Sequence, residues 1–170
     1  QKTAYEIKEC DWSSDVCSSD LAKPFDFSNP PFDPIGVSQE LVKFMYDKSG
    51  IYLTGPQVGV PYRVFSLRAS PQNFVCFNPK IVQPSEEVIL LEETSLTFPG
   101  MGVKIKRPRH CRVRFATPNG EIRTETFTGM TARAFQHCMD FLNGEVFYRK
   151  ANRSEEHTSE LQSHSFISYA

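Results

Sequence analysis

One stretch constrains the fold more than any other: residues 135–144, which read Phe-Gln-His-Cys-Met-Asp-Phe-Leu-Asn-Gly. This apolar run ends on a glycine, a common helix stop, and therefore predicts a helix. Residues four apart on a helix share a face, so His137 and Phe141 are expected on the same side. Cys138 directly follows His137 and is expected about 100° around the helix from it.

Two further motifs precede this predicted helix. Residues 50–60 read Gly-Ile-Tyr-Leu-Thr-Gly-Pro-Gln-Val-Gly-Val, and residues 92–100 read Glu-Glu-Thr-Ser-Leu-Thr-Phe-Pro-Gly. Taken alone, the Gly-Pro-Gln segment ending at Gln57 indicates no more than a turn.

Together the three motifs resemble those of peptide deformylases, in the same order and at fitting spacings. That family usually reads Gly-Ile-Gly-Leu-Ala-Ala-Pro-Gln-Val-Gly, Glu-Glu-Gly-Cys-Leu-Ser-x-Pro-Gly and Gln-His-Glu-x-Asp-His-Leu-Asn-Gly. The resemblance implies an α+β fold, in which a twisted antiparallel sheet surrounds a central helix that carries the metal-site histidine. It also implies a metal-dependent hydrolase that uses iron, zinc or nickel to remove the N-formyl group from the initiator methionine of nascent peptides.

The resemblance assigns family roles to nine positions of this chain. The catalytic positions hold Gln57, Leu96 and Cys138; the metal positions hold His137, Ser95 and Phe141; the substrate-binding positions hold Ile51, Tyr52 and Gly55.

Four departures from the family pattern bear on its chemistry. Cys138 replaces the glutamate that acts as general base, and Phe141 replaces the second histidine ligand. Ser95 replaces the cysteine ligand, and a hydroxyl that stays protonated is a poor zinc ligand. Tyr52 replaces a glycine where backbone approaches the substrate, so its ring is expected to obstruct the cleft. One good ligand remains where the family has three. We therefore expect a pseudoenzyme, inactive or severely impaired, that binds its metal weakly or not at all.

Three other interpretations stay open at this point. An active metal-dependent deformylase would need unorthodox ligands, such as His137 with Cys138 or Asp140. A non-catalytic peptide-binding module would use Gln57, Leu96 and an apolar cleft. A metal-free hydrolase would pair Cys138 or Ser95 with His137, but the sequence supplies no orienting acid. We give a purely structural role for His137, as a core histidine, the same weight as these functional roles.

The two ends of the chain do not read like protein. Residues 12–21 back-translate onto a sequencing-library adapter, and residues 153–163 onto its reverse complement, with compatible barcodes beside them. We interpret residues 1–21 and 153–170 as adapter-derived artefacts on a metagenomic fragment. Residues 22–152 are then expected to form a single deformylase-like domain that is truncated at both ends.

Charge and cysteine content bound the partners and the compartment. Residues 22–152 contain 16 of the 19 basic and 12 of the 20 acidic residues, a net charge of +4. This is too little to indicate a nucleic-acid-binding protein; no DNA partner is expected, and only weak proximity to the ribosome is compatible with it. Three widely spaced cysteines remain, which favours the reducing cytoplasm over a disulfide framework. No segment suggests a membrane span. We expect a monomer.

The rest of the domain predicts a helix followed by strands. An apolar stripe over residues 36–48 predicts a helix, with Ser38 as its N-cap and Gly50 as its stop. Residues 62–67, 74–82 and 88–91 are predicted to form the core sheet.

Residues 103–108 and 111–115 alternate apolar with basic side chains, as half-exposed strands do, and we interpret them as a solvated cationic face. Pro118-Asn119-Gly120 predicts a hairpin turn into residues 121–127, and residues 146–148 a final short strand.

Overall fold

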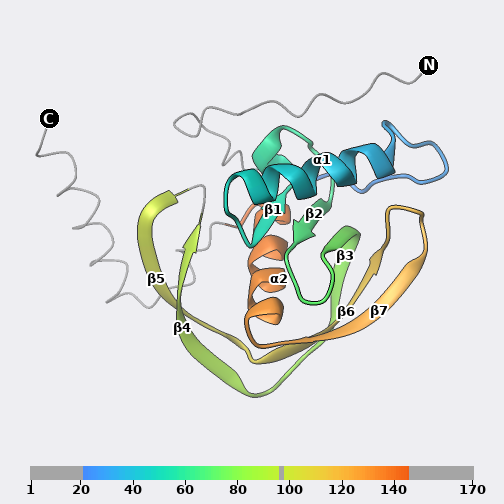
Figure 1. The fold of residues 1–170 in the computed structure, drawn as a ribbon. Coiled ribbons are helices and arrows are strands. Elements are labelled where there is room, and N and C mark those ends of the chain that lie inside the picture. Colours follow the sequence, from blue (N-terminus) through green and yellow to red (C-terminus); the bar gives the residue numbers. More distant parts are fainter. Residues whose placement is uncertain (1–20, 96–97, 146–170) are drawn as a thin grey trace, which may run out of the picture.

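The computed structural model describes residues 21–95 and 98–145 of the chain (Figure 1). The predicted strand at residues 146–148 and both proposed adapter segments, apart from Leu21, lie outside these residues. The described elements follow one another as α1 (Pro34–Asp47), β1 (Tyr52–Thr54), the 3-10 turn η1 (Pro56–Val58), β2 (Val64–Leu67), β3 (Phe74–Pro84), β4 (Val88–Ser95), β5 (Phe98–Pro108), β6 (His110–Ala116), β7 (Ile122–Thr128) and α2 (Gly129–Leu142).

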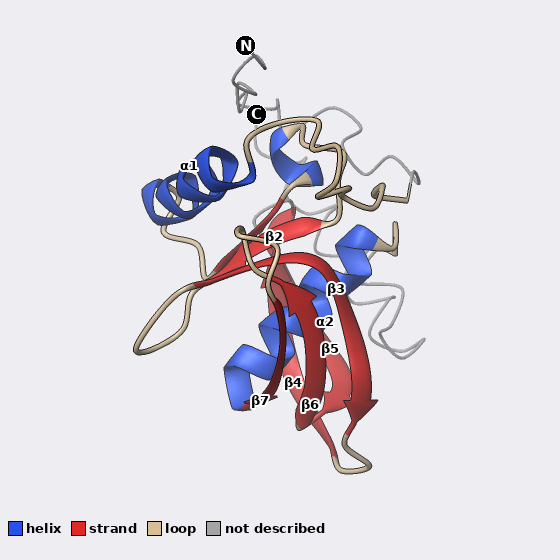
Figure 2. Cartoon of the chain, turned by 90° about the vertical axis from the view of Figure 1, so that its right-hand side faces the viewer, coloured by secondary structure: helices blue, strands red, loops and turns tan. Residues whose placement is uncertain are grey.

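The strands form two antiparallel sheets. Five strands pair in the order β1-β2-β3-β6-β7, and β4 pairs with β5 in a separate two-stranded sheet. Because β3 leads directly into β4, and β5 into β6, the two sheets form the arms of a bend that encloses α2 (Figures 1 and 2). The prediction that residues 88–91 join the core sheet is therefore wrong. The chain bends between β3 and β4, so these residues pair with β5 instead.

Both faces of the five-stranded sheet are covered near β2. Phe65 and Leu67 point into the apolar cluster that contains α2, whereas Val64 belongs to the cluster under α1. The ring of Phe65 meets that of Phe135 edge-on at 5.1 Å between centroids. The expected arrangement of a twisted antiparallel sheet around a central helix is confirmed. No helix in the described part of the chain is long and apolar enough to cross a membrane.

The cap of α1 differs from the prediction. The Asp33 carboxylate accepts hydrogen bonds from the backbone N–H groups of Ile35 and Gly36, at 3.1 and 3.0 Å, so the helix begins at Pro34. The Ser38 hydroxyl lies one turn inside and donates to the Pro34 carbonyl. A carboxylate followed by proline is an equally good start signal, and it comes first along the chain. At the other end Ser49, with φ of 54°, takes the left-handed conformation in place of Gly50.

The predicted helix at residues 135–144 corresponds to the second half of α2, which ends at Leu142 with Asn143 as its C-cap. The helix has two different buried faces, and this division positions the candidate site. Phe135, Cys138 and Leu142 belong to the apolar cluster against the five-stranded sheet. A polar face is also buried, and it interacts with β4 and β5; it consists of Arg133, Gln136, His137 and Asp140. The spacings of three, four and seven residues keep each set on its own side.

Candidate functional site

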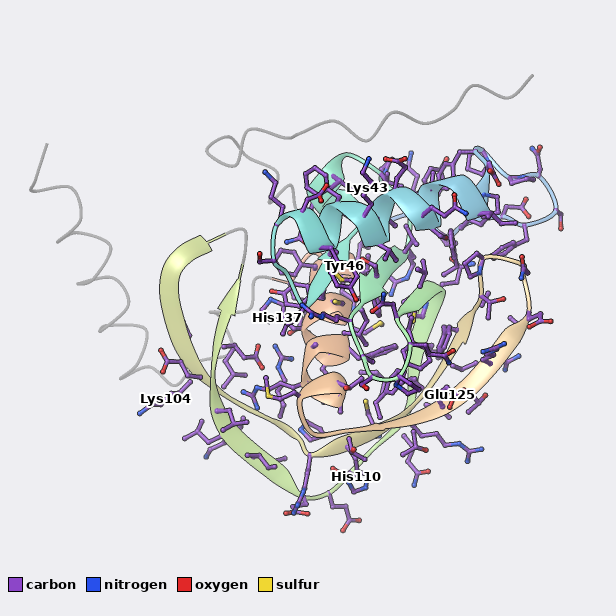
Figure 3. All side chains as sticks on the ribbon, in the orientation of Figure 1. Lys43, Tyr46, Lys104, His110, Glu125 and His137 are labelled. Atoms are coloured by element: carbon purple, nitrogen blue, oxygen red, sulfur yellow. The ribbon has the colours of Figure 1, made fainter. Side chains whose placement is uncertain are left out.

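His137 is the centre of the candidate site. Its side chain projects from α2 toward β1 and β4 and is 2% exposed (Figure 3). The Nε2 atom lies 3.0 Å from the Tyr52 hydroxyl, and the Nδ1 atom lies 2.8 Å from Oε2 of Glu93. The ring stacks obliquely between two aromatic rings, with centroid distances of 4.9 Å to Tyr52 and 5.2 Å to Phe141. Both ring nitrogens and the surrounding space are therefore taken by protein groups.

Glu93 holds this histidine and is itself held by two arginines. Arg107 contacts both carboxylate oxygens, at 2.5 and 2.8 Å, and Nε of Arg133 lies 2.7 Å from Oε1. Burial alone raises the pKa of the Glu93 carboxyl. The hydrogen bonds from His137 and Arg107, together with their charge, outweigh that effect and lower the pKa to about 2. An ionised carboxylate only accepts hydrogen bonds, so Nδ1 of His137 is the donor. The other ring nitrogen, Nε2, is hydrogen-bonded to the Tyr52 hydroxyl.

The two arginines join the helix to the two-stranded sheet. Arg107 also contacts Oδ2 of Asp140 at 2.8 Å, and burial of this guanidinium is outweighed by its two acidic partners, which raise its pKa. Arg133 donates to the backbone carbonyls of Ile89, Leu91 and Ile105 at 3.2, 2.7 and 2.5 Å. Two guanidinium groups and two carboxyl groups therefore meet in this buried cluster. Such pairs are costly to break because the surviving charge loses its partner.

The first motif places Gln57 on η1, close to the end of β1. Its amide oxygen accepts two hydrogen bonds of 2.9 Å, from the backbone N–H and the hydroxyl of Thr54. These bonds fix the orientation of the buried amide. Gly55 meets a packing requirement: an added Cβ would lie 2.8 Å from the Val60 carbonyl oxygen. Ile51, by contrast, is exposed.

Cys138 lies apart from these groups although it follows His137 in sequence. It is fully buried among the apolar residues between α2 and the five-stranded sheet, in the same cluster as Cys76. Burial raises the pKa of its thiol well above the ordinary value, and the neighbouring Cys76 and Asp140 add to that effect. The thiol is thus protonated at neutral pH and faces away from the imidazole.

The second motif is only partly visible. The backbone of Ser95 ends β4, paired with Phe98, whereas the side chain of Ser95 and the whole of Leu96 lie outside the described residues. The structure therefore brings together Tyr52, His137 and Phe141 from the predicted set and adds Glu93 and the two arginines.

The residues that the sequence analysis missed do carry signals. Arg107 occupies an inward position in the alternation of β5, where Val103 and Ile105 are buried. Arg133 precedes His137 by four residues and so shares its helix face. Glu93 lies within the second motif, but nothing in the sequence shows that it meets a histidine 44 residues away.

Comparison with known proteins assigns the fold to a family. Residues 22–157 match the model of the polypeptide deformylase family. The chain belongs to this family. It is 33% identical over 133 residues to the peptide deformylase of Microchaete diplosiphon, an alignment that covers 75% of this chain and 71% of that relative. It is 36% identical over 106 residues to the enzyme of Thermotoga neapolitana, covering 62% of this chain and 65% of the relative.

A solved structure shows the same likeness. The peptide deformylase of Synechococcus elongatus, crystallised in complex with actinonin, superposes with a TM-score of 0.79 at 26% identity. The alignment covers 88% of this chain and 84% of that one.

The family uses a divalent metal, and the residues described here do not fit one. Nε2 of His137 is already hydrogen-bonded to the Tyr52 hydroxyl, and the phenyl ring of Phe141 offers no lone pair. Glu93 and Asp140 are bound by arginines whose positive charge opposes a cation. Among the described residues, no three His, Cys, Asp or Glu side chains come together in a way that could hold an ion. The donor set is that of a buried hydrogen-bond network.

Proposed function

We propose that this protein is a deformylase-fold pseudoenzyme, in which metal-dependent removal of the formyl group has been lost and His137 serves as a structural hydrogen-bonding centre. The observation that carries the proposal is the engagement of both imidazole nitrogens, by Tyr52 and by Glu93. A histidine held in this way needs no metal to satisfy its hydrogen-bonding groups.

The chemistry of the family reaction supports the same conclusion. A metal hydrolase must lower the pKa of a bound water to about 7 and remove its proton. Catalytic zinc sites usually take three protein ligands, and this chain retains one imidazole. Changes outside the ligand set already cost about 10- to 100-fold in affinity or activity. Replacing two ligands, and burying a thiol in place of the base, should remove the activity.

The alternatives that use other ligands gain no support from this geometry. Cys138 is turned toward the apolar core, and Asp140 would have to release Arg107 before it met an ion beside His137. For a metal-free hydrolase, Glu93 is an acid that orients His137, which the sequence did not reveal. The other imidazole nitrogen, however, is hydrogen-bonded to the buried phenol of Tyr52, at the place where the nucleophile would be required.

The first test is metal content with catalysis on the same sample. The full chain, purified without chelator, is analysed for iron, nickel and zinc and assayed for formate release from formyl-Met-Ala-Ser. We expect far less than one metal per chain and no formate above a protein-free blank. Near-stoichiometric metal with turnover would overturn the proposal. Binding of the peptide without turnover would instead indicate the peptide-binding module.

A restored variant supplies the matched control. Tyr52→Gly, Ser95→Cys and Phe141→His together return the three ligand positions and the open cleft, and they should restore stoichiometric metal. Adding Cys138→Glu should then restore formate release. A folded triple variant that still binds no metal would show that these positions are not the cause of the loss.

A further inference from the structure

The side of the sheets that faces away from α2 carries a regular line of cations. Along β5 and β6 the inward residues are buried, whereas Lys104, Lys106, Arg112 and Arg114 are exposed. All four are even-numbered, and the side-chain period of a strand is two. Neighbouring cations on one strand are therefore about 7 Å apart.

The line widens across the neighbouring strands. Lys80 on β3 is the direct partner of Arg114, whose other neighbour is Thr124 on β7. Arg112 lies between Gln83 and Thr126 in the same way. We call the five cations the basic stripe: Lys80, Lys104, Lys106, Arg112 and Arg114. Apart from Lys80, the groups beside its two arginines are neutral hydrogen-bonding side chains.

The residues that the structure describes do not neutralise the basic stripe. Within the described residues none of the five cations forms an ion pair, whereas the nearby exposed Arg109 and Arg123 are paired with Glu87 and Glu121. Glu92, the register partner of Lys104, is the one acidic residue among the direct strand partners of the stripe in this part of the chain. Like charges directly opposite on paired strands, such as Lys80 and Arg114, destabilise a sheet. A polyanion bound outside would remove that repulsion.

The shape of this face indicates which polyanion fits. The chain bends at Arg109, so Lys104 and Lys106 lie on one arm and Arg112 and Arg114 on the other; Figure 3 shows Lys104 and His110 pointing outward at different places on the bend. A flat bilayer could meet only one arm at a time. Duplex DNA would have to be bent to follow the turn, and such a bend costs elastic free energy. A single strand can follow it.

We propose that the basic stripe binds the phosphate backbone of a single-stranded nucleic acid, without reading its sequence. Lysines and arginines supply the charge, and the threonine and glutamine side chains beside them can donate to phosphate oxygens. The proposal depends on how the charges are distributed rather than on the net charge, and it is independent of the fate of the metal centre.

Fluorescence anisotropy with labelled oligouridylate tests the proposal on the full chain. If all five cations contact phosphates, affinity should fall about 100-fold between about 50 and 200 mM salt. Arg112→Gln with Arg114→Gln should reduce that fall to about 20-fold and weaken binding at low salt. The control pair, Lys23→Gln with Lys43→Gln, removes two exposed cations outside the stripe and should leave both quantities unchanged. A DNA oligonucleotide of equal length shows whether the ribose hydroxyl contributes.

Three results would overturn the proposal. One is the absence of binding to either oligonucleotide at the lowest salt. Another is equal weakening by the stripe pair and the control pair, with both proteins folded by circular dichroism. The third is tighter binding to phosphatidylglycerol vesicles than to RNA at the same salt, which would assign the stripe, with the exposed Val88 and Leu90 nearby, to a membrane surface.

Discussion

We expect the free energy of unfolding to fall in acid because the Glu93 carboxylate must be protonated there. Its pKa is lowered from the ordinary 4.5 to about 2 in the folded protein. A pKa that is lower in the folded state contributes stability that is fully present above the unfolded value and lost as the pH falls through the folded value. At about 1.4 kcal/mol per pKa unit, the contribution is about 3 kcal/mol, of which about 2 kcal/mol is lost by about pH 3.

Other carboxylates also titrate in this range, so the measurement is a difference between two proteins. Glu93→Gln removes the charge at every pH and leaves Arg107 and Arg133 without their shared partner, which should cost about 3–5 kcal/mol at about pH 7. The free energy of unfolding is measured in urea by circular dichroism. The difference in this free energy between wild type and Glu93→Gln should be smaller by about 2 kcal/mol at about pH 3 than at neutral pH. Glu92→Gln, at an exposed neighbour, should stay within about 0.5 kcal/mol of wild type throughout.

A difference in free energy of unfolding between the two proteins that stays constant from neutral to acid pH would refute this reasoning. It would mean that the Glu93 carboxyl titrates alike in the folded and unfolded chains, and hence that His137 and Arg107 do not hold it in its ionised form.

Three further outcomes are expected from the same contacts. Tyr52→Phe keeps the ring beside His137 but removes the hydroxyl, and should lower the free energy of unfolding in urea by about 1–3 kcal/mol. The control Tyr46→Phe, at a half-exposed tyrosine, should lower it by less. Equal losses would argue against the buried hydrogen bond between Tyr52 and His137. Cys138 should resist alkylation in the native protein at mildly alkaline pH and react after unfolding, as read by peptide mapping; fast native labelling would contradict its burial. Phe65→Ala should cost about 3–5 kcal/mol because the cavity lies in the core; a loss below about 1 kcal/mol would contradict its packing against Phe135.

Much of the fold could be read from local sequence. The alternation in β5 and β6, the turn before β7 and the helical run at residues 135–144 are short-range patterns, and the structure has each of them. The errors occur where two local signals compete or where pairing is long-range. Asp33 outcompetes Ser38 as the cap of α1, and β4 leaves the main sheet because the chain bends at its start.

The sequence by itself determined the family motifs and the four departures that bear on the family chemistry, because these are matters of which side chain stands at which position. Only the tertiary structure decided which groups the side chains of the site contact. Tyr52 and His137 are 85 residues apart, and Glu93 and His137 are 44 apart, so no local pattern could pair them. Burial then makes each pairing matter, since a polar group removed from water must find its partner within the protein.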